Sequence, residues 1–132
     1  MRNLSDIISV LEARFPLHYA EEFDNPGLLV GNRNKNVAKA LICLDCTASV
    51  VDEAIAKNAD LIISHHPVIF KEQKSFCSDT PLGKTLVKAA ENGISIYSAH
   101  TNLDSAPGGL TDYIAKLLCL EVIETMDGIL RR

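Results

Sequence analysis

Apolar residues fall into two kinds of pattern along the chain, and the two kinds alternate. Continuous apolar runs at residues 37–44, 61–64 and 94–99 are typical of strands whose two faces are both covered by helices. A shorter run at residues 28–30 predicts a further strand, which follows a polar loop over residues 20–27. The pattern therefore predicts a sheet built largely from buried strands.

Helical spacing separates these strands. The first helix is predicted over residues 4–15, with Asn3 or Ser5 as its cap and Pro16 directly after it. Its apolar positions are Leu4, Ile7, Ile8 and Leu11. A second helix begins after Thr47 and runs to about residue 58. The predicted inner face of this second helix carries Val50, Val51, Ala54 and Ile55.

Two more helices are predicted in the second half of the chain. Thr80 and Pro81 open the third helix, because proline suits the first helical position, and Gly93 closes it. The fourth helix covers residues 110–118 and follows a loop at residues 107–109. The remaining segments are a turn at residues 31–35, a long loop at residues 69–79, and a strand or ordered tail at residues 120–132.

Strands that alternate with helices favour parallel pairing through right-handed crossovers. We therefore predict an α/β fold with a mostly parallel or mixed sheet and helices on both faces. The chain has 132 residues, of which 47% are hydrophobic and 23% charged. This length and composition fit a single globular domain over residues 1–132.

The charge and hydropathy of the chain argue against two classes of partner. The formal net charge is −4 and no basic block is present, so nucleic acid is not expected as a partner. The apolar runs are far shorter than a membrane span, so no membrane partner is expected. The first residues lack a signal-peptide core, and the cytoplasm is the expected location.

The four cysteines are Cys43, Cys46, Cys77 and Cys119. Cys43 and Cys46 have the spacing of a CxxC pair, but the sequence has no second pair to complete a zinc site of four thiolates. We interpret all four as reduced, mostly buried structural thiols. A redox pair formed by Cys43 and Cys46 is the alternative.

Side chains with metal-binding chemistry follow three of the predicted strands. Asp45 follows the first of them, His65 and His66 follow the next, and His100 follows the third, with Asp104 close behind. Parallel strands bring their carboxyl ends to one edge of a sheet, where α/β proteins bind ligands, so these groups should converge. Imidazole and carboxylate are ligands for zinc, iron, nickel and manganese. The sequence therefore predicts a metal site at this edge.

The two adjacent histidines suggest more than one ion. Consecutive strand residues point to opposite faces, so His65 and His66 cannot both serve one ion while the strand continues straight. Pro67 favours an extended conformation at His66, where the chain leaves the sheet. Each histidine could then bind a different metal, with Asp104 as a bridging or additional ligand. Two ions about 3.5–4 Å apart would activate a hydroxide and stabilise charge on a substrate oxygen.

Several roles stay open at this point. His100 could be a metal ligand, a group that supports the ligands, or a general acid or base. Asp45 could orient a ligand or cap the helix that follows it. Asp104 has a structural alternative, an Asx turn in the loop that leads to the fourth helix. His18 is expected to be a core histidine.

Three segments resemble motifs of the NIF-three-like family, the GTP cyclohydrolase 1 type 2 homologues. Residues 64–71 read Ser-His-His-Pro-Val-Ile-Phe-Lys and match its HHP-(I/L)-(I/F)-F motif. Residues 99–109 contain His-Thr-Asn-Leu-Asp and a later Gly-Gly, as in its HTNLD…GG motif. Residues 20–28 are similar to AE-x-W-D-N-x-G-L, with Phe23 in place of tryptophan and Pro26 before the glycine.

The resemblance implies a dinuclear metal site at the junction of two similar α/β lobes, within a ring-shaped hexamer. Carried over by motif, His65, His66 and Asp104 are metal ligands, and His100 lies beside them as a neighbour of the ligands or as the catalytic proton-transfer group. The family's remaining ligands, a histidine followed four residues later by a glutamate, lie near the end of a longer chain. After Asp104 this sequence has no histidine. We therefore expect residues 1–132 to be one lobe of a larger protein, with a face free to self-associate.

The leading functional hypothesis is a metal-dependent hydrolase-type protein with two divalent metal ions (zinc, iron, nickel or manganese). Its family name points to a nucleotide or a related heterocycle as the small-molecule substrate. Lys71 and Lys74 are expected in a solvated loop, where they could meet an anionic substrate. The alternatives are a non-catalytic metal-binding or protein-interaction scaffold, and a redox module built on Cys43 and Cys46.

Overall fold

The structure is a computed structural model that describes residues 1–121, 125–126 and 130–131. Its helices are α1 (Leu4–Arg14), the 3-10 helix η1 (Leu17–Tyr19), α2 (Ala48–Ala56), α3 (Pro81–Glu91), α4 (Thr101–Ser105) and α5 (Leu110–Leu117). Its strands are β1 (Arg2–Asn3), β2 (Gly27–Val30), β3 (Asn36–Val37), β4 (Ala40–Cys43), β5 (Leu61–Ser64), β6 (Ser95–Ser98), β7 (Thr125–Met126) and β8 (Leu130–Arg131).

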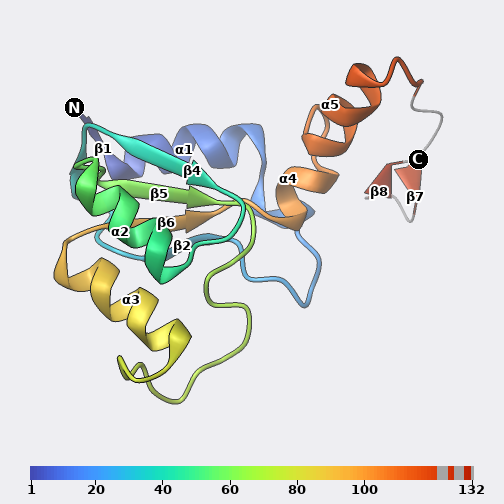
Figure 1. Ribbon diagram of the computed structural model, residues 1–132. Coiled ribbons are helices and arrows are strands. Elements are labelled where there is room, and N and C mark those ends of the chain that lie inside the picture. Colours follow the sequence, from blue (N-terminus) through green and yellow to red (C-terminus); the bar gives the residue numbers. More distant parts are fainter. Residues whose placement is uncertain (122–124, 127–129, 132) are drawn as a thin grey trace.

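The central sheet has four strands in the order β2-β6-β5-β4. Strands β4, β5 and β6 are parallel, and β2 pairs antiparallel with β6 at one side of the sheet. This mixed sheet, with helices on both faces, confirms the predicted α/β class. The three parallel strands point toward the same edge, beyond which α4 and α5 lie (Figure 1).

Helix α1 covers one face of the sheet. Leu61 and Tyr97, from the two central strands, face this helix and pack with Leu4 and Ile8 in one buried cluster. All four side chains are 2% exposed or less. Burial of each such side chain contributes roughly 1.5–3 kcal/mol relative to exposure, so this contact holds α1 firmly against the sheet.

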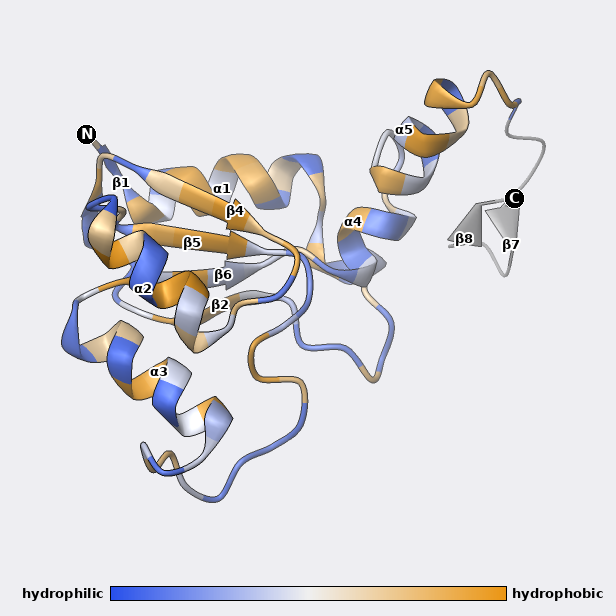
Figure 2. Cartoon of the chain, viewed as in Figure 1, coloured by the Kyte–Doolittle hydropathy of each residue, from blue (hydrophilic) through white to orange (hydrophobic). Residues whose placement is uncertain are grey.

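Helices α2 and α3 cover the opposite face. Ile62 and Ile96 are the neighbours of Leu61 and Tyr97 along their strands. Because consecutive strand residues point to opposite faces, they point to this other side. They pack with Val51 and Ala54 of α2 and with Ala89 of α3. The hydropathy colouring shows the apolar strands β4 and β5 between helices of mixed polarity (Figure 2).

Helices α1, α2 and α3 begin where the sequence predicted. Asn3, Thr47 and Thr80 each accept a hydrogen bond from a backbone N–H in the first turn of α1, α2 and α3, at 3.0, 3.4 and 3.0 Å. Side-chain caps of this kind satisfy backbone donors that have no partner inside the helix. Gly93 follows α3 with a positive φ of 65°, a conformation that glycine adopts without strain.

The prediction of one continuous strand over residues 37–44 is wrong. The segment is divided into β3 and β4, and the two residues between them hydrogen-bond elsewhere. The backbone N–H groups of Ala38 and Lys39 donate to Oδ2 of Asp60, at 2.8 and 3.1 Å. Because these donors point toward a side chain, the strand ladder is interrupted at this point.

The segment after β6 also differs from the prediction, because residues expected in a loop form the short helix α4. Asn102 of this helix is fully buried. Its Oδ1 accepts from the backbone N–H of His100 at 3.0 Å, and its Nδ2 donates to the Phe15 carbonyl at 2.8 Å. A buried side chain with both ends bonded fixes this turn of helix against the end of α1.

Three predictions of burial are corrected. His18 was expected in the core, but it lies exposed in η1 with its ring centroid 4.5 Å from that of Tyr19. Ile55 was expected on the inner face of α2 and is 36% exposed. The thiols of Cys77 and Cys119 are exposed, and all four cysteines are free.

The last segment was predicted as a strand or an ordered tail. Within it the structure describes β7 and β8, which pair antiparallel. Residues 122–124, 127–129 and 132 of that prediction lie outside the described residues. Among the helices in the described part of the chain, none combines the length and apolar character that crossing a membrane requires.

Candidate metal centre

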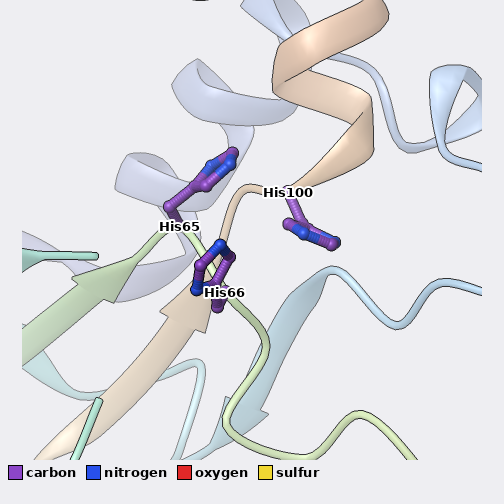
Figure 3. A group of neighbouring side chains, drawn as sticks. All are labelled: His65, His66 and His100. Atoms are coloured by element: carbon purple, nitrogen blue, oxygen red, sulfur yellow. The ribbon is translucent and has the colours of Figure 1, made fainter. Parts of the chain in front are cut away.

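Three of the four histidines gather where the parallel strands end (Figure 3). His65 and His66 follow the last residue of β5, and His100 follows β6 after one intervening residue. The ring centroids are 5.2 Å apart for His65 and His66, 5.1 Å for His65 and His100, and 5.5 Å for His66 and His100. One possible ligand nitrogen from each ring lies within 4.8 Å of the other two.

Two buried hydroxyls align the strand ends that carry these rings. The Oγ atoms of Ser64 and Ser98 lie 2.8 Å apart, and Ser64 Oγ also donates to the His66 carbonyl at 2.9 Å. Both serines are 1% exposed or less. Because β5 and β6 are joined at this level, the residues that follow them leave the sheet side by side.

His65 is oriented by the backbone. Its Nδ1 lies 2.9 Å from the carbonyl oxygen of Ala99, and a carbonyl can only accept, so Nδ1 carries the hydrogen. Its Nε2 is thereby left for another partner and lies 3.6 Å from Oδ1 of Asp104. This separation is long for a hydrogen bond but close to the roughly 3.4 Å expected between two ligands of one tetrahedral ion with bonds of about 2.1 Å.

His66 is oriented by a side chain. Its Nδ1 lies 2.7 Å from Oδ1 of Asp45, the residue two positions after the end of β4. Both side chains are substantially exposed, at 46% and 62%. Thr47, rather than Asp45, caps α2. Asp45 therefore orients His66 and does not cap the helix, which were the two roles considered for it.

His100 is oriented by Asp24, whose side chain is fully buried. Oδ1 of Asp24 lies 2.9 Å from His100 Nδ1, and it also accepts from the Asn25 N–H at 2.7 Å. Oδ2 accepts from both the backbone N–H and the hydroxyl of Thr101. The carboxylate therefore fixes the ring of His100 while leaving its Nε2 unbound by this contact.

The pKa of Asp24 reflects the same contacts. Burial acts to raise it, but hydrogen bonds from Thr101, His100 and Asn25 together bring the pKa below its ordinary value of 3.8. Asp24 is thus an anion at neutral pH. A carboxylate on the Nδ1 side is a common way to hold a metal-binding imidazole in one tautomer.

The structure brings together the residues that the sequence predicted to converge. His65, His66 and His100 form one cluster, Asp104 faces His65, and Asp45 contacts His66 from the outer side. Asp24 was not assigned a role from the sequence. It lies 76 residues before His100, and its only signal was its place in the motif-like segment 20–28.

The pKa values of the cysteine pair, Cys43 and Cys46, are raised rather than lowered. Burial raises the pKa of Cys46 to about 12, with a further contribution from Cys43. Burial, with the carboxylates of Asp45 and Glu53, also raises the pKa of Cys43. Thiols of this kind stay protonated at neutral pH and are poor nucleophiles, so these observations do not favour a redox module.

An α/β fold with a histidine cluster at the ends of its parallel strands defines the class: an α/β protein with a candidate metal centre. The family model of Duf34/NIF3 (NGG1p interacting factor 3) matches residues 2–129, and the chain belongs to this family.

Proteins and solved structures similar to the chain agree with this assignment. A GTP cyclohydrolase 1 type 2 homolog of Clostridium perfringens is 45% identical over 115 residues, which are 87% of this chain and 44% of that protein. The structure of a Bacillus cereus protein related to NIF3 matches with a TM-score of 0.86 and 46% identity, over 94% of this chain and 34% of that one. Reduced HcgD from Methanocaldococcus jannaschii matches with a TM-score of 0.89 and 36% identity, over 97% and 52%.

The chain spans less than half of the length of the Clostridium relative, and a third of a Bacillus subtilis relative that is 43% identical over 124 residues. The comparisons thus cover only part of these longer proteins.

Proposed function

We propose that this chain contributes His65, His66, His100 and Asp104 to a centre for divalent metal ions in a hydrolase-type protein. The observation that carries the proposal is the shared orientation of three imidazoles. Each ring has its Nδ1 against an acceptor, so each keeps Nε2 for a ligand. Three independent acceptors would not be needed if the histidines only filled space.

The donor set suits zinc, iron, nickel or manganese, which bind imidazole and carboxylate together. His65 and Asp104 would share one ion, as their 3.6 Å separation suggests. His66 and His100 would serve a second ion, or His100 would stay free for proton transfer. A dinuclear centre with two such ions is the form that we favour.

When bound, divalent ions supply Lewis acidity and an activated water for hydrolysis. The chain's own contribution is orientation and proton transfer. Asp24 holds the Nδ1 hydrogen of His100, so Nε2 can take a proton from a group in the centre and return it. The relatives' name, GTP cyclohydrolase 1 type 2 homolog, makes a nucleotide or a related heterocycle our proposed substrate class.

Metal binding is the first test. Titration of the metal-free chain with zinc or manganese should give tight binding, which a His65→Ala/His66→Ala double variant abolishes. His18→Ala is the matched control, because His18 is exposed and lies outside the cluster. Equal metal affinity for the double variant and for wild type would refute the centre.

Hydrolysis is the second test, and it separates an enzyme from a metal-binding scaffold. The scaffold is favoured by an apolar surface on α5, where Tyr113, Ile114 and Leu117 are 46–64% exposed. Release of product from a nucleotide panel, lost in Asp104→Ala, would exclude the scaffold. Retained metal binding without hydrolysis by the full-length gene product would support it.

Self-association completes the proposal. We propose that the exposed face of α5 packs against protein, either a second lobe or another copy, in a hexameric assembly. Light scattering of the chain at increasing concentration should show oligomers, which Leu117→Lys should dissociate. A monomer at all concentrations would contradict the proposed self-association.

We propose the cytoplasm as the location of the protein. The four free cysteines fit the reducing conditions of that compartment.

A further inference from the structure

Two phenylalanines stand exposed beside the histidine cluster. Phe23 is 66% exposed and Phe70 is 44% exposed. Their ring centroids lie 6.3 Å apart in an edge-on arrangement, and the ring of Phe70 lies 6.2 Å from that of His100 at 89°. Single exposed apolar residues are ordinary, but exposed aromatic rings that contact each other and a candidate metal ligand need a reason.

The two rings come from segments that are far apart in the sequence but fixed to the same site. Phe23 directly precedes Asp24, which is bound to His100 and Thr101. Phe70 directly follows Ile69, whose carbonyl accepts from Asn25 Nδ2 at 2.7 Å. Each ring is therefore attached to a backbone position that is anchored within one residue of it. The backbone that carries the rings is held in place, although the rings themselves are open to solvent.

The geometry points to a binding surface for a planar aromatic ring. We propose that Phe23 and Phe70 form an aromatic wall beside the metal centre, and that the substrate has an aromatic or heteroaromatic ring that packs on this wall while its reacting group lies at the histidines. Aromatic rings prefer offset or edge-on contacts with one another at centroid distances of about 4.5–7 Å. Phe23 and Phe70 already adopt this spacing, so a third ring can add to the series.

This inference rests on the proposed function, because it assumes that the reacting group binds at the histidine cluster. What it adds is the pair of residues, Phe23 and Phe70, that would bind the flat part of the substrate. A long flexible alkyl group would bury less area against two edge-on rings than a flat ring would. The lysines that follow Phe70 in the loop, Lys71 and Lys74, are exposed and give no shape selection of this kind.

The test uses metal-binding probes that differ only in their tail. Dissociation constants are measured on the zinc-loaded chain for acetohydroxamate, cyclohexanecarbohydroxamate and benzohydroxamate. Benzohydroxamate should bind about tenfold more tightly than acetohydroxamate, and cyclohexanecarbohydroxamate should gain less. Equal affinity of the three, or equal gains from the flat and the puckered ring, would overturn the aromatic wall.

Leucine variants locate the effect. Phe70→Leu should reduce the benzohydroxamate advantage to about twofold or less, and Phe23→Leu should reduce it in part. Phe76→Leu is the matched control, because Phe76 is 50% exposed but lines a separate apolar cavity of 290 Å³ with residues of α3. An unchanged advantage in Phe70→Leu, or a variant that alters only self-association, would overturn the wall.

Failure of the metal centre is recognised separately. If zinc does not bind to wild type, the proposed function fails, and the wall is then tested on the metal-free chain. With ring-labelled phenylalanine, adenosine should shift the NMR signals of Phe23 and Phe70, whereas ribose should not. Shifts confined to Phe15 or Phe76, or no shifts with adenosine up to its solubility limit, would count against the wall.

Discussion

One aspartate lies at each end of the parallel strands, and the two accept hydrogen bonds from different groups. At the edge where β5 begins, Asp60 accepts hydrogen bonds from the backbone N–H groups of Ala38 and Lys39. At the opposite edge, Asp24 accepts from the ring of His100 and from Thr101. Asp60 is 31% exposed, whereas the Asp24 side chain is fully buried.

The pKa of both carboxyls lies below the ordinary value, for different reasons. Hydrogen bonding to the Ala38 N–H is the main cause for Asp60; burial is the next-largest influence and opposes it, and the Lys39 N–H and the Lys35 ammonium add to the lowering. For Asp24 burial is the largest influence and acts to raise the pKa, but several hydrogen bonds together outweigh it. A carboxylate kept ionised in a buried place has to be held by many donors. When one of those donors is a histidine whose other nitrogen is free, the anchor also prepares a functional group.

Removal of the buried aspartate should have the largest effect. Asp24→Ala leaves the donors of Thr101 and His100 without a partner in a buried position, and should lower the free energy of unfolding by about 3 kcal/mol. Zinc affinity should fall by about 10–100-fold, since His100 loses its orientation. Urea unfolding and zinc titration measure the two effects. A loss below about 1 kcal/mol would mean that water replaces the carboxylate without cost; Asp24→Asn, which keeps an acceptor, should lose less.

Thr101→Val tests one donor of the same anchor. The hydroxyl of Thr101 donates to Asp24 and accepts from the Glu21 N–H at 3.0 Å. Valine has nearly the same shape, so the loss of about 1–2 kcal/mol in unfolding free energy would come from these bonds. Serine at this position is the control, because it keeps the hydroxyl. Equal losses for Val and Ser would assign the effect to packing instead.

At the other end of the strands, Asp60→Ala should lower the free energy of unfolding by about 1 kcal/mol, because the backbone donors that lose Asp60 can be hydrated. This difference in unfolding free energy between wild type and variant should depend on pH. Since the folded state lowers the pKa of Asp60 below 3.8, its contribution is complete above that value and is lost as the pH falls through the lowered pKa. Urea unfolding at pH 6 and at progressively lower pH checks this. A difference that grows in acid would reverse the sign and contradict it.

Asp45→Ala should have the smallest effect on folding and still affect the metal. Asp45 and His66 form an exposed pair, so the change in unfolding free energy should stay below about 0.5 kcal/mol. Zinc affinity should nevertheless fall by about tenfold, because His66 loses the acceptor on its Nδ1. Asp52→Ala, at another exposed carboxylate that pairs with Lys88, is the control and should leave zinc affinity unchanged. If both variants bind zinc like wild type, an exposed carboxylate such as Asp45 does not influence zinc affinity, and only a buried one such as Asp24 can do so.

The sequence predicted the parts of the molecule that depend on neighbours along the chain. Apolar runs located β2, β5 and β6. Caps located three helix starts, because Asn3, Thr47 and Thr80 act within one turn. The convergence of His65 and His100 followed from the rule that parallel strands end at one edge. These inferences needed no knowledge of distant contacts.

The missed features all depend on distant contacts. The break in the strand at Ala38 is made by Asp60, and α4 is fixed by the bond of Asn102 to Phe15. Asp24 orients a ring that is remote in sequence, and no periodicity signals such a pair. His18 was misjudged because the position of a single histidine carries no information on its burial.

The distance along the chain between Asp24 and His100 has a consequence for the order of folding. Seventy-six residues separate the two groups, so their contact closes a long loop, and the entropy of that closure must be offset by contacts made earlier. We therefore expect the sheet and its helices to assemble before His100 takes its final orientation. During synthesis, the N-terminal segment must wait for β6 and α4 to emerge. The proposed metal centre would thus be completed late in folding, and metal affinity would then report how complete the fold is.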